Sequence, residues 1–125
     1  MYVRFIVLAP RRRRPFGVFR ADRQALEDAD LPAWLREQVD AQYEWFNKNL
    51  RIPRKPNGGR IEVTGVCWFQ NGAREHIARA RHLAWLLAEA GHPTQMITTR
   101  HPGYIVYSDN FQIVAKPEAR TRLTA

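Results

Sequence analysis

The sequence contains very little cysteine and serine. Cys67 is the one cysteine among 125 residues, so no disulfide can form within the chain, which fits a reducing cytoplasm. Cys67 shares the alternating face of Val63 and Phe69, and this position predicts a small buried core residue rather than a nucleophile. Ser108 is the one serine and falls in a predicted turn, so the sequence offers no serine nucleophile motif.

The sequence also lacks a long apolar run. The first apolar stretch, residues 2–9, is too short to cross a bilayer and is typical of a strand. The basic residues Arg11 to Arg14 follow this stretch, whereas a signal peptide carries its basic residues first. We therefore expect a cytoplasmic protein with no membrane partner.

Metal-binding and catalytic patterns are missing as well. His76 and His82 lie six positions apart on a predicted helix, whereas zinc-binding pairs on a helix are three or four positions apart. His76 lies near the core side of that helix, which favours a structural role. Glu62 and Asp109 are isolated acids. We expect no cofactor and no metal, and an enzyme is the minority interpretation.

Arginine, by contrast, is abundant. The net charge is +8 and the pI is about 10.5, and among 20 basic residues only Lys48, Lys55 and Lys116 are lysines. Such a charge attracts an anionic partner, either nucleic acid or an acidic protein surface. The alternative is that the arginine bias reflects genome composition and that the charge has no partner.

The basic residues gather in two loops and on one helix flank. The loops lie at about residues 10–16 and about 51–60, and Arg81 accompanies Trp85 on the helix. A tryptophan among guanidinium groups can stack on a base, or it can simply seal the edge of the core. The loops can likewise be solvated and without a partner. The candidate nucleic-acid-binding residues are Arg11, Arg12, Arg13, Arg14, Arg51, Arg54, Lys55, Arg60, Arg81 and Trp85.

A strand, a helix, a second strand and a hairpin are predicted in succession over residues 60–116. Apolar residues alternate over residues 61–69 as in a strand, and an apolar stripe follows at helical spacing over 73–88. Gly91 stops this helix, and a short strand is predicted over residues 94–99. Alternating residues on both sides of Ser108-Asp109-Asn110 then predict the hairpin.

An earlier helix is predicted over residues 32–50. Pro32 suits the first helical position, and Asp30 can cap the helix. We therefore predict a single α+β domain over residues 1–125, in which two main helices cover a mixed sheet of four to five strands. A polar, frayed tail is expected at about residues 118–125.

The best-placed polar cluster follows from the strand–helix–strand unit. Ligands favour the carboxyl ends of such strands, beside the helix N-terminus, whose N–H groups attract anions. Arg74 opposes the helix dipole in the first turn, and a bound anion would offset this conflict; alternatively, Glu75 and water satisfy Arg74. The candidate anion-binding residues are Asn71, Gly72, Arg74, Thr99 and Arg100.

Two tryptophans mark the flank of the earlier helix. Trp34 and Trp45 lie about a third of a turn from its apolar stripe. At such positions tryptophan either covers a sheet edge, which we favour, or anchors a partner protein.

Three segments, LPAWLREQVDAQYEWFNKNLRIPR, GVCWFQNGAREHIARARHLAWLLAEAG and RHPGYIVYSDNFQIVAKP, carry a resemblance. The chain from about Gly17 to Pro117 resembles a group of small bacterial proteins of unassigned function. The resemblance implies a free-standing bacterial cytoplasmic domain and transfers no functional residue.

These patterns favour a non-enzymatic, small basic module that binds an anionic partner, with nucleic acid as the leading candidate. The first rival is a protein–protein module, such as an inhibitor or immunity-type partner, anchored by Trp34, Trp45 and Trp85. The second rival is a small enzyme that acts on a phosphorylated ligand at the edge formed by Arg74 and Arg100.

Overall fold

The computed structural model describes residues 1–8, 16–17, 26–61 and 65–121. Its elements in chain order are β1 (Tyr2–Val7), β2 (Phe16–Gly17), α2 (Ala33–Asn49), β3 (Val66–Gln70), α3 (Arg74–Glu89), β4 (Thr94–Thr99), β5 (Tyr104–Ser108) and β6 (Gln112–Lys116). The predicted basic segment Arg11–Arg14 and the end of the predicted tail, residues 122–125, lie outside the described residues.

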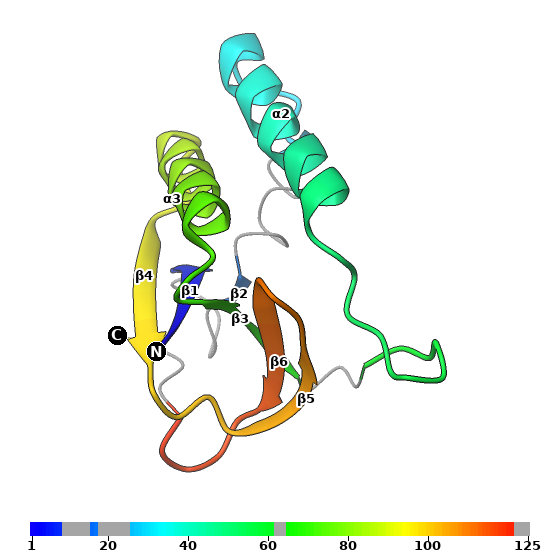
Figure 1. Ribbon diagram of the computed structural model, residues 1–125. Coiled ribbons are helices and arrows are strands. Elements are labelled where there is room, and N and C mark those ends of the chain that lie inside the picture. Colours follow the sequence, from blue (N-terminus) through cyan, green and yellow to red (C-terminus); the bar gives the residue numbers. More distant parts are fainter. Residues whose placement is uncertain (9–15, 18–25, 62–64, 122–125) are drawn as a thin grey trace.

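The strands form one sheet in which β1 is the central element. The order is β2-β1-β3-β6-β5, and β4 pairs with β1 along its other edge (Figure 1). Tyr2 shows the arrangement, because it pairs with Gln70 of β3 on one side and with Thr99 of β4 on the other. The strand β1 thus separates the two strands that α3 connects.

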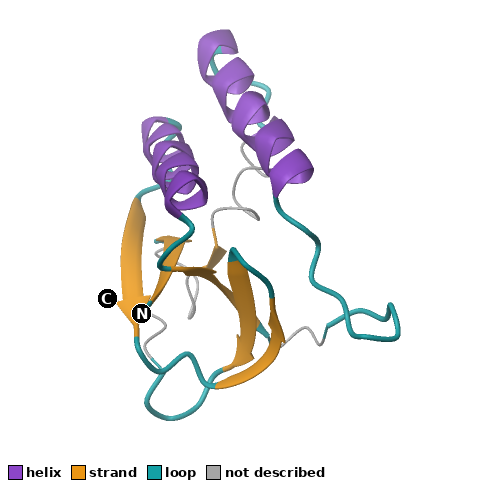
Figure 2. Ribbon diagram, viewed as in Figure 1, coloured by secondary structure: helices purple, strands orange, loops and turns teal. Residues whose placement is uncertain are grey.

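Both helices lie on the same side of the sheet and run in opposite directions (Figures 1 and 2). The helix α3 buries Ala80, Leu83 and Leu87 against the sheet, and α2 adds Leu35 and Val39. Full burial of one such large aliphatic side chain stabilises a fold by about 1.5–3 kcal/mol. A second apolar cluster occupies the other face, where Ile6, Trp68, Ile97, Ile113 and Ala115 are buried together.

The end of α3 follows from its glycine. Gly91 has φ +93, and its N–H donates to the carbonyl of Ala88 while the N–H of His92 donates to the carbonyl of Leu87. This pair of bonds is a Schellman motif, which favours glycine at the left-handed position. The chain then turns back into β4.

The predicted α+β class, the strand–helix–strand unit and the C-terminal hairpin are confirmed. Two details of the sheet differ from the prediction. Every pairing between described strands is antiparallel, because β1 lies between β3 and β4, whereas a mixed sheet was expected. The two-residue β2 also joins the five longer strands.

Two details of the predicted helix and strand starts also differ. The expected cap Asp30 makes no capping hydrogen bond, and α2 begins with Pro32 in the cap position. The described part of β3 begins at Val66 rather than Ile61. None of the helices in the described ranges combines the length and apolar character needed to cross a membrane.

Candidate nucleic-acid interface

The connection from α2 to β3 projects from the body of the protein at the right of Figure 2. We call residues 50–61 of this connection the basic finger. The backbone at Leu50 leaves the helix in an extended conformation, with φ −134 and ψ 122. Arg54 and Arg60 then pair as an isolated antiparallel bridge and close the finger. The connection predicted as an exposed basic loop is therefore a short hairpin with an ordered tip.

The tip owes its shape to the sequence Lys55-Pro56-Asn57-Gly58-Gly59. The N–H of Lys55 donates to the carbonyl of Gly59, and the N–H of Gly58 donates to the carbonyl of Lys55, each at 2.8 Å. Gly58 has φ +85, which glycine adopts without steric cost. The side-chain oxygen of Asn57 accepts from the N–H of Gly59 at 2.9 Å. Residues 56–59 thus form the tip, and Arg54, Lys55 and Arg60 flank it in the chain.

The base of the finger is fixed by the turn between β5 and β6. The Nε2 of Gln112 donates to the carbonyl of Arg51 at 2.7 Å and to a carboxylate oxygen of Asp109 at 3.1 Å. The same carboxylate accepts from the hydroxyl of Tyr107 at 2.7 Å and from the backbone N–H of Phe111 at 2.8 Å. Burial raises the pKa of Asp109, but these hydrogen bonds outweigh it and hold the pKa below its ordinary value.

His76 joins the two helices and this turn. Its Nε2–H donates to the carbonyl of Asn49 at 2.8 Å, and its ring stacks on Phe111 with centroids 4.2 Å apart. The ring is 6% exposed and also contacts Trp45 edge to face. The structural role expected for this histidine is confirmed. Phe111, stacked on it, keeps 41% of its surface exposed beside the finger.

The finger is a concentration of positive charge. The sequence from Asn47 to Ile61 holds five basic residues and no acid. All five side chains are exposed, and none forms an ion pair or hydrogen bond with another described residue. These residues are Lys48, Arg51, Arg54, Lys55 and Arg60. Because like charges repel, the site favours an anionic partner that lies across several of them.

A groove runs along each side of the finger. The larger has a volume of about 750 Å³ and lies between the end of α2 and the β5–β6 turn, with Lys48, Arg51 and Phe111 in its walls. The other has a volume of about 460 Å³ and is lined by Arg54, Arg60 and the outer side of β3. Both grooves therefore combine basic side chains with apolar surface.

Apart from Arg11–Arg14, which lie outside the described residues, the predicted nucleic-acid-binding residues divide into two groups. Arg51, Arg54, Lys55 and Arg60 are brought together in the finger, whereas Arg81 and Trp85 lie on α3, on the other side of the molecule (Figure 1). The guanidinium of Arg81 donates to the sulfur of Met96 at 3.7 Å. Trp85 is 51% exposed and stacks on His82, so it does not seal the core edge beneath Arg81.

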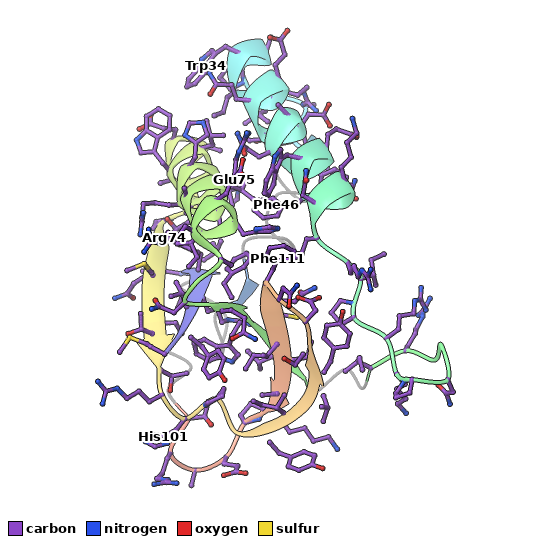
Figure 3. The ribbon with its side chains drawn as sticks, viewed as in Figure 1. Trp34, Phe46, Arg74, Glu75, His101 and Phe111 are labelled. Atoms are coloured by element: carbon purple, nitrogen blue, oxygen red, sulfur yellow. The ribbon has the colours of Figure 1, made fainter. Side chains whose placement is uncertain are left out.

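The predicted anion site at the strand ends is less well formed. Arg74 begins α3, whereas His101, next to Arg100, lies in the loop beyond the end of β4 (Figure 3). The N–H groups of Ala73 and Arg74 already donate to the carbonyls of Gln70 and Gly72. No contact joins the two arginines in the described part of the chain. A shared anion at this edge stays a prediction.

The other three members of that site are also placed. Thr99 is buried, and its hydroxyl accepts from the N–H of His101 at 3.0 Å. Asn71 and Gly72 form an exposed turn. Of these three residues, Asn71 and Gly72 are exposed and close to Arg74 in the sequence, whereas Thr99 is buried.

Cys67 corrects a prediction. Its side chain is exposed and precedes Phe69, where β3 first pairs with β1, whereas a buried core residue was expected. Packed protein on its other sides desolvates the thiol and raises its pKa. The thiol is therefore protonated at neutral pH and is a weak nucleophile.

Sequence reasoning missed Lys48 and Phe111 as members of the candidate interface. Lys48 stands alone at a helix end, and no charge run marked it. Phe111 belongs to an alternating pattern that is typical of a strand, and nothing in this pattern indicates an exposed ring. One face of the ring is covered by His76, a contact between residues far apart in the sequence.

No known protein family, curated protein or solved structure matches the chain. The comparisons transfer no functional residue, so the functional assignment rests on the geometry.

Proposed function

We propose that this protein binds nucleic acid through the basic finger. The observation that carries the proposal is the set of four exposed basic side chains on the finger, joined by the exposed Lys48 at the end of α2, with no acid between Asn47 and Ile61. Phosphate groups are the commonest regularly spaced anions that such a surface meets. Contacts of Lys and Arg with phosphates release condensed counterions and supply most of the sequence-independent affinity.

The finger is suited to backbone contact rather than to base reading. Its tip, residues 56–59, carries no charged side chain, so the basic side chains that flank the tip are the groups that can reach a phosphate backbone. Arginine forms two parallel hydrogen bonds with a phosphate. The half-exposed ring of Phe111 lies at the base and offers a face on which an unpaired base can stack. We therefore expect little sequence preference and tighter binding to single strands.

A second candidate function has its own observation. Trp34 and Trp85 are 49% and 51% exposed. Trp34 begins α2 and Trp85 lies near the end of α3, and because the helices are antiparallel these positions fall at the same end of the helical layer (Figure 3). Exposed tryptophans are common anchors of protein interfaces. Trp45 is not part of this surface, because it packs against Phe46 and His76.

The test uses two variants that lose the same number of charges. The finger variant replaces Arg51, Arg54, Lys55 and Arg60 with Gln. The matched control replaces Arg74, Arg81, Arg100 and Arg120, four exposed arginines elsewhere in the described chain, with Gln. Fluorescence anisotropy measures the affinity of each protein for labelled single-stranded and duplex DNA and for single-stranded RNA.

The finger variant should bind about tenfold or more weakly, while the control variant should retain most of the wild-type affinity. Equal weakening in both variants would assign binding to net charge alone and contradict a finger site. If wild type does not bind and a Trp34→Ala, Trp85→Ala double variant loses a protein partner, the second candidate function is favoured.

A further inference from the structure

The sheet opens between β1 and β3. The strand β1 pairs with β3 at Tyr2 and Val3 and with β2 at Ile6 and Val7. Arg4, between these two pairings, has no partner on that edge among the described strands. A cavity of about 200 Å³ lies at the opening. It adjoins the grooves beside the basic finger, because Leu50 also lines the larger groove and Cys67 also lines the smaller one.

The walls of this cavity are mainly apolar. Phe5, Leu50, Trp68 and Phe69 contribute rings and aliphatic surface. An apolar cavity of about 150 Å³ in another protein is large enough to hold benzene. The volume here therefore suits a molecule the size of one substituted ring or a short branched chain.

One charged group lines the cavity. The Nη1 of Arg4 donates to the carbonyl of Cys67 at 3.3 Å, and the other donors of the guanidinium have no hydrogen-bond acceptor among the described residues. Its other terminal nitrogen lies close to Gly17, where a Cβ atom would stand 3.6 Å away. No carboxylate pairs with Arg4 among the residues that the structure describes.

The surroundings of Arg4 disfavour its charge. Burial lowers the pKa of the guanidinium, and the neighbouring Cys67 thiol is protonated at neutral pH and supplies no counter-charge. A partly desolvated cation gains most from an anion that brings its own hydrogen-bond acceptors.

We propose that the cavity between β1 and β3 binds a small organic carboxylate, with the carboxylate on Arg4 and the apolar body among Phe5, Leu50 and Phe69. The planar guanidinium matches a carboxylate in a paired arrangement of hydrogen bonds. The apolar walls exclude a bare inorganic anion as the preferred ligand, because phosphate would be desolvated without gaining apolar contact.

The probe is benzoate, with benzamide as its uncharged counterpart and with acetate and inorganic phosphate as small anions. Benzoate should raise the melting temperature of the wild-type protein in a saturable way, by roughly 10 °C at a hundredfold excess over Kd. Benzamide, acetate and phosphate should produce only the gradual drift expected of a solute. A phosphate effect equal to that of benzoate would overturn the assignment.

Arg4→Met keeps much of the length of the side chain and removes its charge, and Arg120→Met is the matched control at an exposed site. Affinity for benzoate should fall roughly tenfold to a hundredfold in the first variant and stay unchanged in the second. An Arg4→Met variant that retains the saturable response would contradict the proposal.

A second measurement keeps the test independent of whether Arg4→Met folds. In the nitrogen-15 NMR spectrum of the wild-type protein, benzoate should shift the backbone amides of Phe5, Cys67 and Phe69. Shifts confined to the basic finger, or no shifts at all, would overturn the site.

Discussion

The basic finger and the outer face of α3 both carry arginines, but they use them differently. On α3, Arg79 forms an ion pair with Glu75 at 3.8 Å, and its guanidinium lies over the ring of Trp45 at 4.9 Å. Arg81 contacts the sulfur of Met96. In the finger, the basic side chains contact none of the described groups by hydrogen bond or ion pair. Arg79 and Arg81 of α3 therefore contact other residues of the protein, whereas the cations of the finger are available to a partner.

The two regions also differ in what holds them in place. The helix α3 is fixed by an apolar face, on which Leu83, Leu86 and Leu87 have no exposed surface. The finger is fixed at its base by polar contacts, chiefly the bond from Gln112 to the carbonyl of Arg51. Changes in the finger should consequently affect binding more than stability, and changes in α3 should do the reverse.

The largest expected effect tests the apolar side of this comparison. Leu83→Ala removes a fully buried side chain of α3 and should lower the free energy of unfolding by about 2–5 kcal/mol. Ile52→Ala is the counterpart in the finger, where the side chain is 75% exposed, and should cost less than about 0.5 kcal/mol. Urea unfolding followed by circular dichroism measures both values. Similar losses in the two variants would mean that the finger is part of the core.

A smaller effect separates the two kinds of tryptophan. Trp45→Ala should cost about 2 kcal/mol, because this ring is half-buried and packs against Phe46 and His76. Trp85→Ala should change the free energy of unfolding by less than about 0.5 kcal/mol, because half of the ring is already exposed. The same unfolding experiment distinguishes them. A large loss for Trp85→Ala would remove it from the candidate partner-binding surface.

The smallest effect concerns the polar base of the finger and depends on pH. The folded-state pKa of Asp109 is below its unfolded value, so its stabilising contribution is present above about pH 4 and is lost as the pH falls through the folded value. Asp109→Asn should destabilise the protein at pH 7, and the difference from wild type should narrow near pH 3. Asp40→Asn, at an exposed carboxylate without a hydrogen bond to any described residue, is the control for the loss of one negative charge. A difference that is constant between pH 7 and pH 3 would contradict this role of Asp109.

The sequence predicted the helices and strands better than the order of the strands in the sheet. Periodicity located α3 and its buried stripe, because helical spacing depends on local residues alone. The insertion of β1 between β3 and β4 could not be predicted in this way. It depends on contacts between residues far apart in the chain, such as the pairing of Val3 with Thr98.

The same limit applies to the candidate sites. The charge of the finger could be predicted from the sequence. Arg51, Arg54, Lys55 and Arg60 lie close together in a segment whose prolines and glycines exclude a long helix or strand. Arg4 gave no signal, since a single arginine within an apolar strand looks like an ordinary outward-facing residue. Its place at the opening of the sheet follows only from where β1 and β3 separate.

The central claim, that the finger and not the net charge binds nucleic acid, is tested most directly by the salt dependence of binding to duplex DNA. The slope of log affinity against log salt should fall by up to about 0.9 for each phosphate that a variant no longer neutralises, and so by up to about 3.6 in the variant with Gln at Arg51, Arg54, Lys55 and Arg60. The control with Gln at the four arginines outside the finger should keep the wild-type slope, and both variants should unfold at the wild-type temperature. A finger variant with an unchanged slope would contradict the account.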